Sequence, residues 1–172
     1  MATDISVLIL MGSDSDVPIM QGAVDLLRDL GVPSEMTVAS AHRSPDRVMR
    51  LVREAPARGV KVFIVGAGAA AHLAGVVAAH TTLPVIGVPV DSSALKGLDA
   101  LLSTVQMPPG VPVATVSIGK PGATNAGVLA AQILALGDPA IAKALASYKK
   151  KLADKVEQAA EKLRTAQAGQ IE

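Results

Sequence analysis

Short, unbroken apolar runs alternate along this chain with longer segments in which apolar residues recur every three or four positions. The runs cover residues 5–11, 60–65, 84–88 and 113–116, with a weaker one at 35–39. A run without polar alternation is typical of a strand that is covered on both faces. We therefore predict an α/β fold, a three-layer sandwich whose central parallel sheet has five strands in the flavodoxin-like order 2-1-3-4-5.

The segments between these runs carry residues that commonly begin and end helices. Pro18 lies near the start and Gly31 just past the end of the first segment, and Pro45 and Gly59 bound the second in the same way. Three further helices are predicted over residues 70–80, 93–102 and 125–136. Strands and helices therefore alternate along the chain, as a parallel sheet requires.

The last segment is longer than the others. Apolar residues continue at helical spacing from Ile141 to Leu163, which predicts a helix of about 30 residues that ends near Gly169. Such a helix is about 45 Å long, whereas a domain of this size is about 30 to 35 Å across. The part of the helix beyond the domain would either fray or be covered by a neighbouring subunit, and the apolar residues that continue to Leu163 favour the neighbour. We therefore expect one domain, with an α/β part over residues 1–137 and a helical extension over residues 138–172 that packs on neighbouring subunits.

The composition excludes several classes of function. Sixteen Lys and Arg balance fifteen Asp and Glu, and the chain has one Phe, one Tyr and no Trp. Nothing here favours binding to a nucleic acid. The lack of Cys excludes disulfides, Fe–S clusters and cysteine nucleophiles, and three scattered His predict no metal site. Because no apolar run reaches the roughly 18 residues of a membrane span and no secretory signal is visible, we expect a cytoplasmic protein that is not bound to a membrane.

The loops after the strands carry the candidate ligand-binding residues, because ligands of open parallel sheets bind beyond the carboxyl ends of the strands. After the first strand, residues 12–16 combine two hydroxyls with the free amides of a helix start, which suits a phosphate. An acid there could accept from ribose hydroxyls, although the same residues would serve as ordinary helix caps. After the second strand, His42 and Arg43 offer a proton carrier and a fixed cation, although a solvated loop histidine has the same pattern.

The loop after the third strand leaves two interpretations open. Gly66, Gly68 and Ala71 match the G-x-G-x-x-A fingerprint of dinucleotide-binding proteins, and Asp91 follows at the spacing of a ribose-binding acid. That fingerprint normally follows the first strand of its unit, however, and small residues equally allow any ligand or second chain to approach the backbone. His80 is expected to cap the far end of the next helix rather than to belong to a site.

Taken together, these loops resemble the PurE family, the carboxyaminoimidazole ribonucleotide mutases of purine biosynthesis. The resemblance rests on residues 11–16, 40–45, 66–68 with 70–73, and 98–108, and it continues through residues 111–120 and 125–126. It covers roughly residues 5–136 in order. It implies a three-layer α/β fold and a homo-octamer in which C-terminal helices reach neighbouring subunits.

The resemblance also implies roles for residues in these loops. His42 is the implied acid/base residue, Arg43 is implied to bind the phosphate, and Ser13 and Asp16 are implied to contact the ribonucleotide. The other expected substrate-binding residues, around the imidazole and the carboxylate, are Ser40, Ala41, Gly68, Ala69, Ala70, His72 and Leu73.

The implied activity is an isomerisation of N5-carboxyaminoimidazole ribonucleotide to 4-carboxy-5-aminoimidazole ribonucleotide. We expect loss of carbon dioxide in a closed pocket and its recapture by a ring carbon, with His42 moving the proton and without a metal or other cofactor. Arg43 after His42 and the Ala-Ala-His-Leu stretch at 70–73 resemble the mutase branch, because the direct carboxylases of the family usually have Lys after that His. The alternatives are direct carboxylation of aminoimidazole ribonucleotide, a dinucleotide-binding enzyme and a non-catalytic nucleotide-binding module.

The chain departs from the family pattern at four positions. Val17 stands where the family usually has Trp, Ala74 where it has Pro, and Pro121 where it has Ala. Ala69 replaces a usual Gly. If that position needs a positive φ, an alanine there costs on the order of 1 kcal/mol. Its methyl group could also narrow the carboxylate pocket.

Overall fold

A computed structural model describes residues 5–168 of the chain and contains one five-stranded sheet with the order β2-β1-β3-β4-β5. The strands are β1 (Val7–Met11), β2 (Ser34–Val38), β3 (Val62–Gly68), β4 (Val85–Val90) and β5 (Ala114–Thr115). All four pairings are parallel. The predicted strands and their order are confirmed, although β5 is shorter than residues 113–116. Pro112, which has no N–H to donate, precedes this edge strand.

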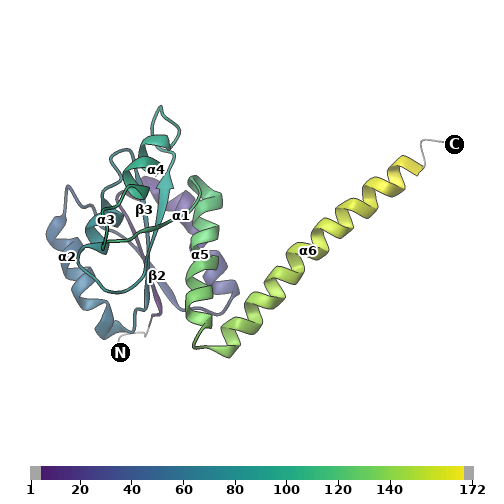
Figure 1. Cartoon of the computed structure of the whole chain (residues 1–172), viewed down its shortest axis with the longest axis horizontal. Coiled ribbons are helices and arrows are strands. Elements are labelled where there is room, and N and C mark those ends of the chain that lie inside the picture. Colours follow the sequence, from purple (N-terminus) through teal and green to yellow (C-terminus); the bar gives the residue numbers. More distant parts are fainter. Residues whose placement is uncertain (1–4, 169–172) are drawn as a thin grey trace.

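Helices cover both faces of the sheet, which confirms the predicted three layers (Figure 1). One face carries α1 (Val17–Asp29) and α5 (Gly119–Ala135), which pack against each other. The other face carries α2 (Pro45–Glu54), α3 (Leu73–Ala78) and α4 (Leu98–Val105). Two short 3-10 turns, η1 (Asp14–Asp16) and η2 (Pro56–Arg58), join these elements.

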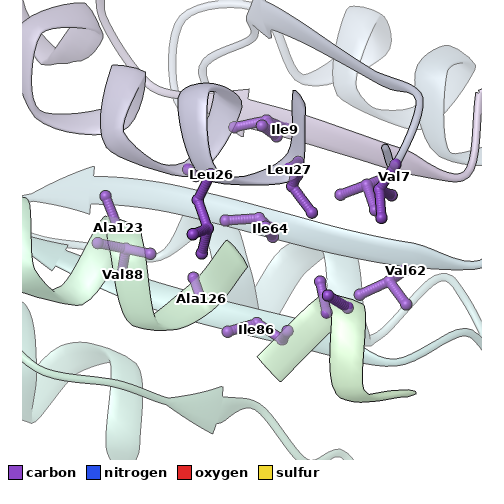
Figure 2. Close-up of a cluster of buried hydrophobic side chains, with 14 of the residues drawn as sticks. Val7, Ile9, Leu26, Leu27, Val62, Ile64, Ile86, Val88, Ala123 and Ala126 are labelled. Carbon is purple, nitrogen blue, oxygen red and sulfur yellow. The ribbon is translucent and has the colours of Figure 1, made fainter. Parts of the chain in front are cut away.

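Alternate residues of the central strands face the two helical layers, so each strand is buried on both sides. Figure 2 shows the face under α1 and α5, where Ile9 of the sheet lies in one cluster with Leu26 and Ala126 of the helices. Leu10 and Phe63 point to the opposite face, toward α2 and α3. This two-sided burial explains why the strands read as unbroken apolar runs in the sequence.

Two helices begin later than the sequence predicts. The expected starts are residue 70 for α3 and residue 93 for α4, but left-handed backbone comes before each helix. Ala69 has a φ of 51°, and Lys96 and Gly97 have φ values of 51° and 85°. Because a residue in this conformation cannot belong to a right-handed helix, each helix starts after it.

By contrast, α5 begins before the predicted residue 125. Its first residues, Gly119 to Pro121, lie outside the predicted range, because glycine and proline usually interrupt helices. Pro121 lies in the first turn, where the missing N–H has no partner to lose. Gly119, with a φ of 72°, provides the sharp entry into the helix.

The predicted long helix is α6 (Pro139–Ala168), which projects away from the domain (Figure 1). Its first turn is capped by Asp138, whose carboxylate accepts hydrogen bonds from the backbone N–H groups of Ala140 and Ile141 at 2.9 and 3.3 Å. Gly169, near which the helix was expected to end, lies outside the described residues. Between residues 5 and 168, no helix is both long and apolar enough to span a bilayer.

The backbone at Ala69 provides a test of the strain in the loop after β3. Left-handed backbone costs an L residue about 1–2 kcal/mol, whereas the freedom of glycine in the unfolded chain costs about 0.4–1 kcal/mol. We therefore expect Ala69→Gly to raise the free energy of unfolding by about 0.5 kcal/mol, as measured by urea denaturation. Ala70, whose φ is not positive, is the matched control. Ala70→Gly should lower the same quantity, and a loss of stability in both variants would contradict the prediction.

Candidate active site

The loops after β1, β2, β3 and β4 converge on one cleft of about 420 Å³ at the carboxyl edge of the sheet. It lies where β1 pairs with β2 on one side and with β3 on the other, the switch point at which ligands of such sheets bind. The lining residues are Gly12, Ser13, Ser15, Asp16, Ser40, Ala41, His42, Arg43, Ala67, Gly68, Ala69, Ala70, Leu73 and Ser92. Ten of the eleven residues predicted for the site therefore meet here, and the eleventh, His72, contacts His42 beside the cleft.

The loop after β1 presents hydroxyls to the cleft and buries a carboxylate beneath them. Ser13 caps η1 by accepting from the backbone N–H of Ser15 at 3.3 Å, and the two hydroxyls lie 2.9 Å apart. Asp16 follows Ser15 in η1 and is only 5% exposed. Burial raises the pKa of Asp16 above its ordinary 3.8, against the smaller opposing effects of hydrogen bonds with Ser15 and Ser13 and of the Arg43 charge.

Arg43 joins the loop after β2 to the loop after β1. Its Nη2 donates to the carbonyl oxygen of Gly12 at 2.6 Å, and its Nε donates to Ser40 Oγ at 3.4 Å. Ser44 closes the same loop, because its hydroxyl accepts from the backbone N–H of Ser40 and donates to the carbonyl of that residue. The guanidinium is thus held in one place at the cleft wall, where its planar fork of donors suits a phosphate or carboxylate.

Two histidines meet at the edge of this cleft. His42 Nε2 and His72 Nδ1 are 2.8 Å apart, and the rings are nearly perpendicular, with 84° between their planes. One of the two nitrogens donates and the other accepts, according to the tautomers present. His42 follows β2 and His72 follows β3, so residues that are 30 positions apart in the sequence form a single hydrogen-bonded pair.

The two glycines of the fingerprint, Gly66 and Gly68, have a packing explanation. A Cβ at Gly66 would lie 2.5 Å from Met20 Sδ, and one at Gly68 would collide with the hydroxyl of Ser92. Both glycines belong to β3 itself rather than to a turn between strand and helix. The dinucleotide alternative expects its glycines in such a turn, so the structure does not support it.

Gly12 and Ser15, which belong to the predicted phosphate-binding loop at residues 12–16, also line the cleft, as do Ala67 and Ser92, which were not among the expected substrate-binding residues. Ser92 carried a weak signal, because it lies in a polar loop at the same predicted edge. His80 behaves as expected at the far end of α3, where its Nδ1 contacts the carbonyl oxygen of Val76 at 2.8 Å. Among residues 5–168, no group of three or more His, Cys, Asp or Glu is placed to hold a metal ion.

The raised pKa of Asp16 predicts how the stability of the fold depends on pH. When folding raises the pKa of a carboxyl group, the protonated group favours the folded state. This contribution to the free energy of unfolding is complete below the pKa of the unfolded state and is lost as the pH rises through the pKa of the folded state. We therefore expect Asp16→Asn to raise the free energy of unfolding at pH 7 and to have no such benefit at pH 3, as measured by urea denaturation. Asp14→Asn, at an exposed neighbour, is the control. A wild type that is more stable than Asp16→Asn at pH 7 would refute the prediction.

The whole chain was also compared with known proteins. Residues 6–155 match the family model described as AIR carboxylase. The N5-carboxyaminoimidazole ribonucleotide mutase of Thermotoga maritima is 52% identical over 155 residues, 90% of this chain and 90% of that protein. The enzyme of the same name from Bacillus subtilis is 61% identical over 137 residues, 80% of this chain and 85% of that protein.

A solved structure, that of Treponema denticola PurE, has a TM-score of 0.82 at 31% identity and covers 91% of this chain and 97% of that one. The similarity thus covers both the sequence and the fold. This chain belongs to the AIR carboxylase, or PurE, family.

Proposed function

We propose that this protein is an N5-carboxyaminoimidazole ribonucleotide mutase, an isomerase of purine biosynthesis that forms 4-carboxy-5-aminoimidazole ribonucleotide. The observation that carries the proposal is the cleft at the switch point, where His42 lies beside a fixed arginine and a buried carboxylate. The names of the relatives from Thermotoga maritima and Bacillus subtilis support it. We retain the expectation of a cytoplasmic enzyme as part of this proposal.

The polar half of the cleft suits a ribonucleotide. Arg43 is anchored by its bonds to Ser40 and Gly12 and keeps its other N–H groups for the phosphate, and the Ser13 hydroxyl stands at the adjoining turn. Asp16 offers acceptor oxygens to the ribose hydroxyls. The lining also includes small residues, among them Gly68, Ala69 and Ala70, which leave space for a planar ring and its carboxylate.

The reaction needs one proton to be given and one to be taken. The bond between the exocyclic nitrogen and the carboxylate carbon breaks, carbon dioxide leaves, and the nitrogen takes a proton from protonated His42. The ring carbon C4 then attacks the carbon dioxide, and the tetrahedral carbon formed loses its proton to His42. The histidine returns to its first state, so a single side chain balances both steps.

Direct carboxylation of aminoimidazole ribonucleotide is the second candidate, because the matching family model is described as AIR carboxylase. It uses the same attack of C4 on carbon dioxide and the same loss of a proton. The source of the carbon dioxide is the bound substrate in the mutase and the solvent in the carboxylase, and only the mutase has to give a proton to the exocyclic nitrogen. A turnover assay therefore separates them where a binding measurement does not.

The first test is a paired turnover assay of the wild type and His42→Asn. One reaction contains the N-carboxylated nucleotide, and the other contains aminoimidazole ribonucleotide with a low concentration of bicarbonate. We expect product from the first reaction only, and a loss of about 10²–10⁴-fold in kcat for His42→Asn, as for a direct acid/base residue. Calorimetry should show that the variant still binds aminoimidazole ribonucleotide.

The other outcomes are equally informative. Product mainly from bicarbonate would assign the protein to the carboxylases. Nucleotide binding without product in either reaction would indicate a non-catalytic module. Near-wild-type turnover by His42→Asn would remove His42 from the mechanism, whatever the substrate.

We also propose that the protein is a homo-oligomer, an octamer, in which the free part of α6 packs on neighbouring copies. Leu145 packs on the domain, and the same face of the helix continues to Leu152, Val156 and Leu163, which are 44%, 66% and 66% exposed. Leu145 and Val156 are eleven residues apart, as are Leu152 and Leu163. Because eleven residues make about three helical turns, this apolar face is nearly straight.

Exposed apolar side chains on α4 supply a second unpartnered surface in the described chain. Leu98, Leu102 and Val105 are 53%, 51% and 47% exposed, and they follow the exposed Leu95. Contiguous apolar surface of this kind marks a protein interface more often than a solvated face. Two such surfaces on one chain support assembly from identical copies.

A charge on the α6 face tests the assembly. We expect Val156→Glu to lower the molar mass measured by light scattering after size exclusion, because a carboxylate at a packed apolar interface is strongly disfavoured. Gln158→Glu introduces the same residue on nearly the opposite side of the helix and should leave the mass unchanged. Equal masses for the wild type and both variants, or an unassembled wild type, would contradict the role of this face.

A further inference from the structure

We infer that Ser92 is the side chain that recognises the transferred carboxylate, by donating a hydrogen bond from its hydroxyl to a carboxylate oxygen. This inference rests on the proposed function, in which the nucleotide occupies the cleft. Ser92 belongs to the loop after β4 and lines the cleft beside the residues of β3. The mechanism proposed above does not use it.

The part of the cleft that comes from β3 and from the loops after β3 and β4 is poor in polar side chains. Its residues are Ala67, Gly68, Ala69, Ala70, Leu73 and Ser92. Of these cleft residues, Ser92 alone has a side chain that can donate a hydrogen bond. Because Ser92 is exposed, its hydroxyl is accessible to a ligand.

The other three serines of the cleft already bond to protein groups. Ser13 and Ser15 lie 2.9 Å apart and hydrogen-bond to each other. The hydroxyl of Ser40 accepts from the backbone N–H and from Nε of Arg43. These hydroxyls shape the loops after β1 and β2, whereas Ser92 reaches the cleft from the other side of the sheet's switch point.

The end of β3 leaves space for the Ser92 hydroxyl. Gly68 is in register with Val90, the last residue of β4, and Ser92 follows two positions later. A Cβ at Gly68 would lie 1.9 Å from Ser92 Oγ, so any other residue there would displace the hydroxyl. Gly68 itself lines the cleft. The hydroxyl of Ser92 therefore occupies the space that a β3 side chain would otherwise fill.

The segments on either side hold Ser92 in this position. Asp91 packs against Gly119, because its Oδ1 lies 3.2 Å from the point at which a Cβ of that glycine would stand. The Asp91 carboxylate is thus at the first turn of α5, where the helix dipole favours a negative charge. On the other side, the hydroxyl of Ser93 accepts from the N–H of Leu95 and closes a turn. The loop that carries Ser92 is therefore tied to the fold at both ends.

The positions of Arg43 and Ser92 match the two charged groups of the nucleotide. Arg43 follows β2 and Ser92 follows β4, and β1 and β3 lie between these strands. Three strand spacings separate the two loops by about 14 Å, which an extended nucleotide can bridge with a hydrogen bond at each end. With the phosphate at Arg43, the imidazole ring and its carboxylate are directed toward β3 and β4, where Ser92 is the side-chain donor.

A neutral hydroxyl suits a carboxylate that has to leave as carbon dioxide. An arginine or lysine at this point would stabilise the charged carboxylate far more than neutral carbon dioxide, and would therefore oppose cleavage of the bond. A serine donates to a carboxylate oxygen and, more weakly, to an oxygen of carbon dioxide, so it holds the group through both steps. Ser92 gives up no proton, and His42 keeps the acid/base role.

The test compares two nucleotides that differ by the carboxylate. Calorimetry measures the Kd of 4-carboxy-5-aminoimidazole ribonucleotide and of aminoimidazole ribonucleotide for the wild type and Ser92→Ala. We expect the variant to bind the carboxylated nucleotide about tenfold to a hundredfold more weakly, as for the loss of a hydrogen bond to a charged group. Its affinity for aminoimidazole ribonucleotide should equal that of the wild type. Because the mutase and the carboxylase form the same carboxylated nucleotide, the test does not depend on the choice between them.

Two further variants separate hydrogen bonding from packing. Ser92→Cys keeps a side chain of similar size against Gly68 but carries a thiol, which is a weak donor, so it should show the same selective loss as Ser92→Ala. Ser117→Ala removes a hydroxyl from the loop after β5, which does not line the cleft, and should leave both Kd values unchanged.

The outcomes distinguish this inference from the proposed function. A loss of affinity for the carboxylated nucleotide alone, in both Ser92 variants, would support the inference. Equal losses for the two nucleotides would reduce Ser92 to a packing residue, and wild-type affinity in either variant would exclude the hydrogen bond. In those cases the proposed function stands. A wild type that binds neither nucleotide would overturn the proposed function, and the inference with it.

Discussion

The parallel pairing of β1 with strands on both sides is the constraint on which the site depends. Met11 is in register with Val38 of β2 and with Gly66 of β3, so three chain segments leave the sheet side by side. The backbone hydrogen bonds of the sheet thus bring together loops that are distant in the sequence. The bond from Arg43 to Gly12 links the loops after the neighbouring strands β2 and β1. The contact between His42 and His72 links the loops after β2 and β3, the two strands that flank β1.

The site also includes features that oppose folding. The carboxylate of Asp16 is buried, and the alanine at position 69 occupies left-handed backbone. Each feature destabilises the folded chain by itself, and both lie in the cleft. The compensation comes from strands whose residues are buried on both faces, as in β1 and most of β3. Rigid central strands therefore tolerate strain in the loops that they position.

The structural features that could be predicted from the sequence share a physical basis, and so do the features that could not be predicted. Unbroken apolar runs report burial on both faces, so the sheet could be predicted, and its carboxyl edge pointed to His42 and Arg43. The late start of α3 depends on the φ of Ala69, which local propensity does not encode because alanine favours helices. Ser92 and the partnership of His72 with His42 depend on distances between loops, which only the folded chain defines.

The catalytic groups do not decide between a mutase and a direct carboxylase. Both reactions need an acid/base residue at the same carbon, and His42 can serve either. The outcome depends on whether carbon dioxide released from the substrate is recaptured before it escapes, which is a property of enclosure. In the isolated chain His42 and His72 are exposed, and the lining of the cleft includes small residues such as Gly68, Ala69 and Ala70. A mutase would therefore need enclosure from the bound nucleotide or from a neighbouring copy in the assembly that we propose.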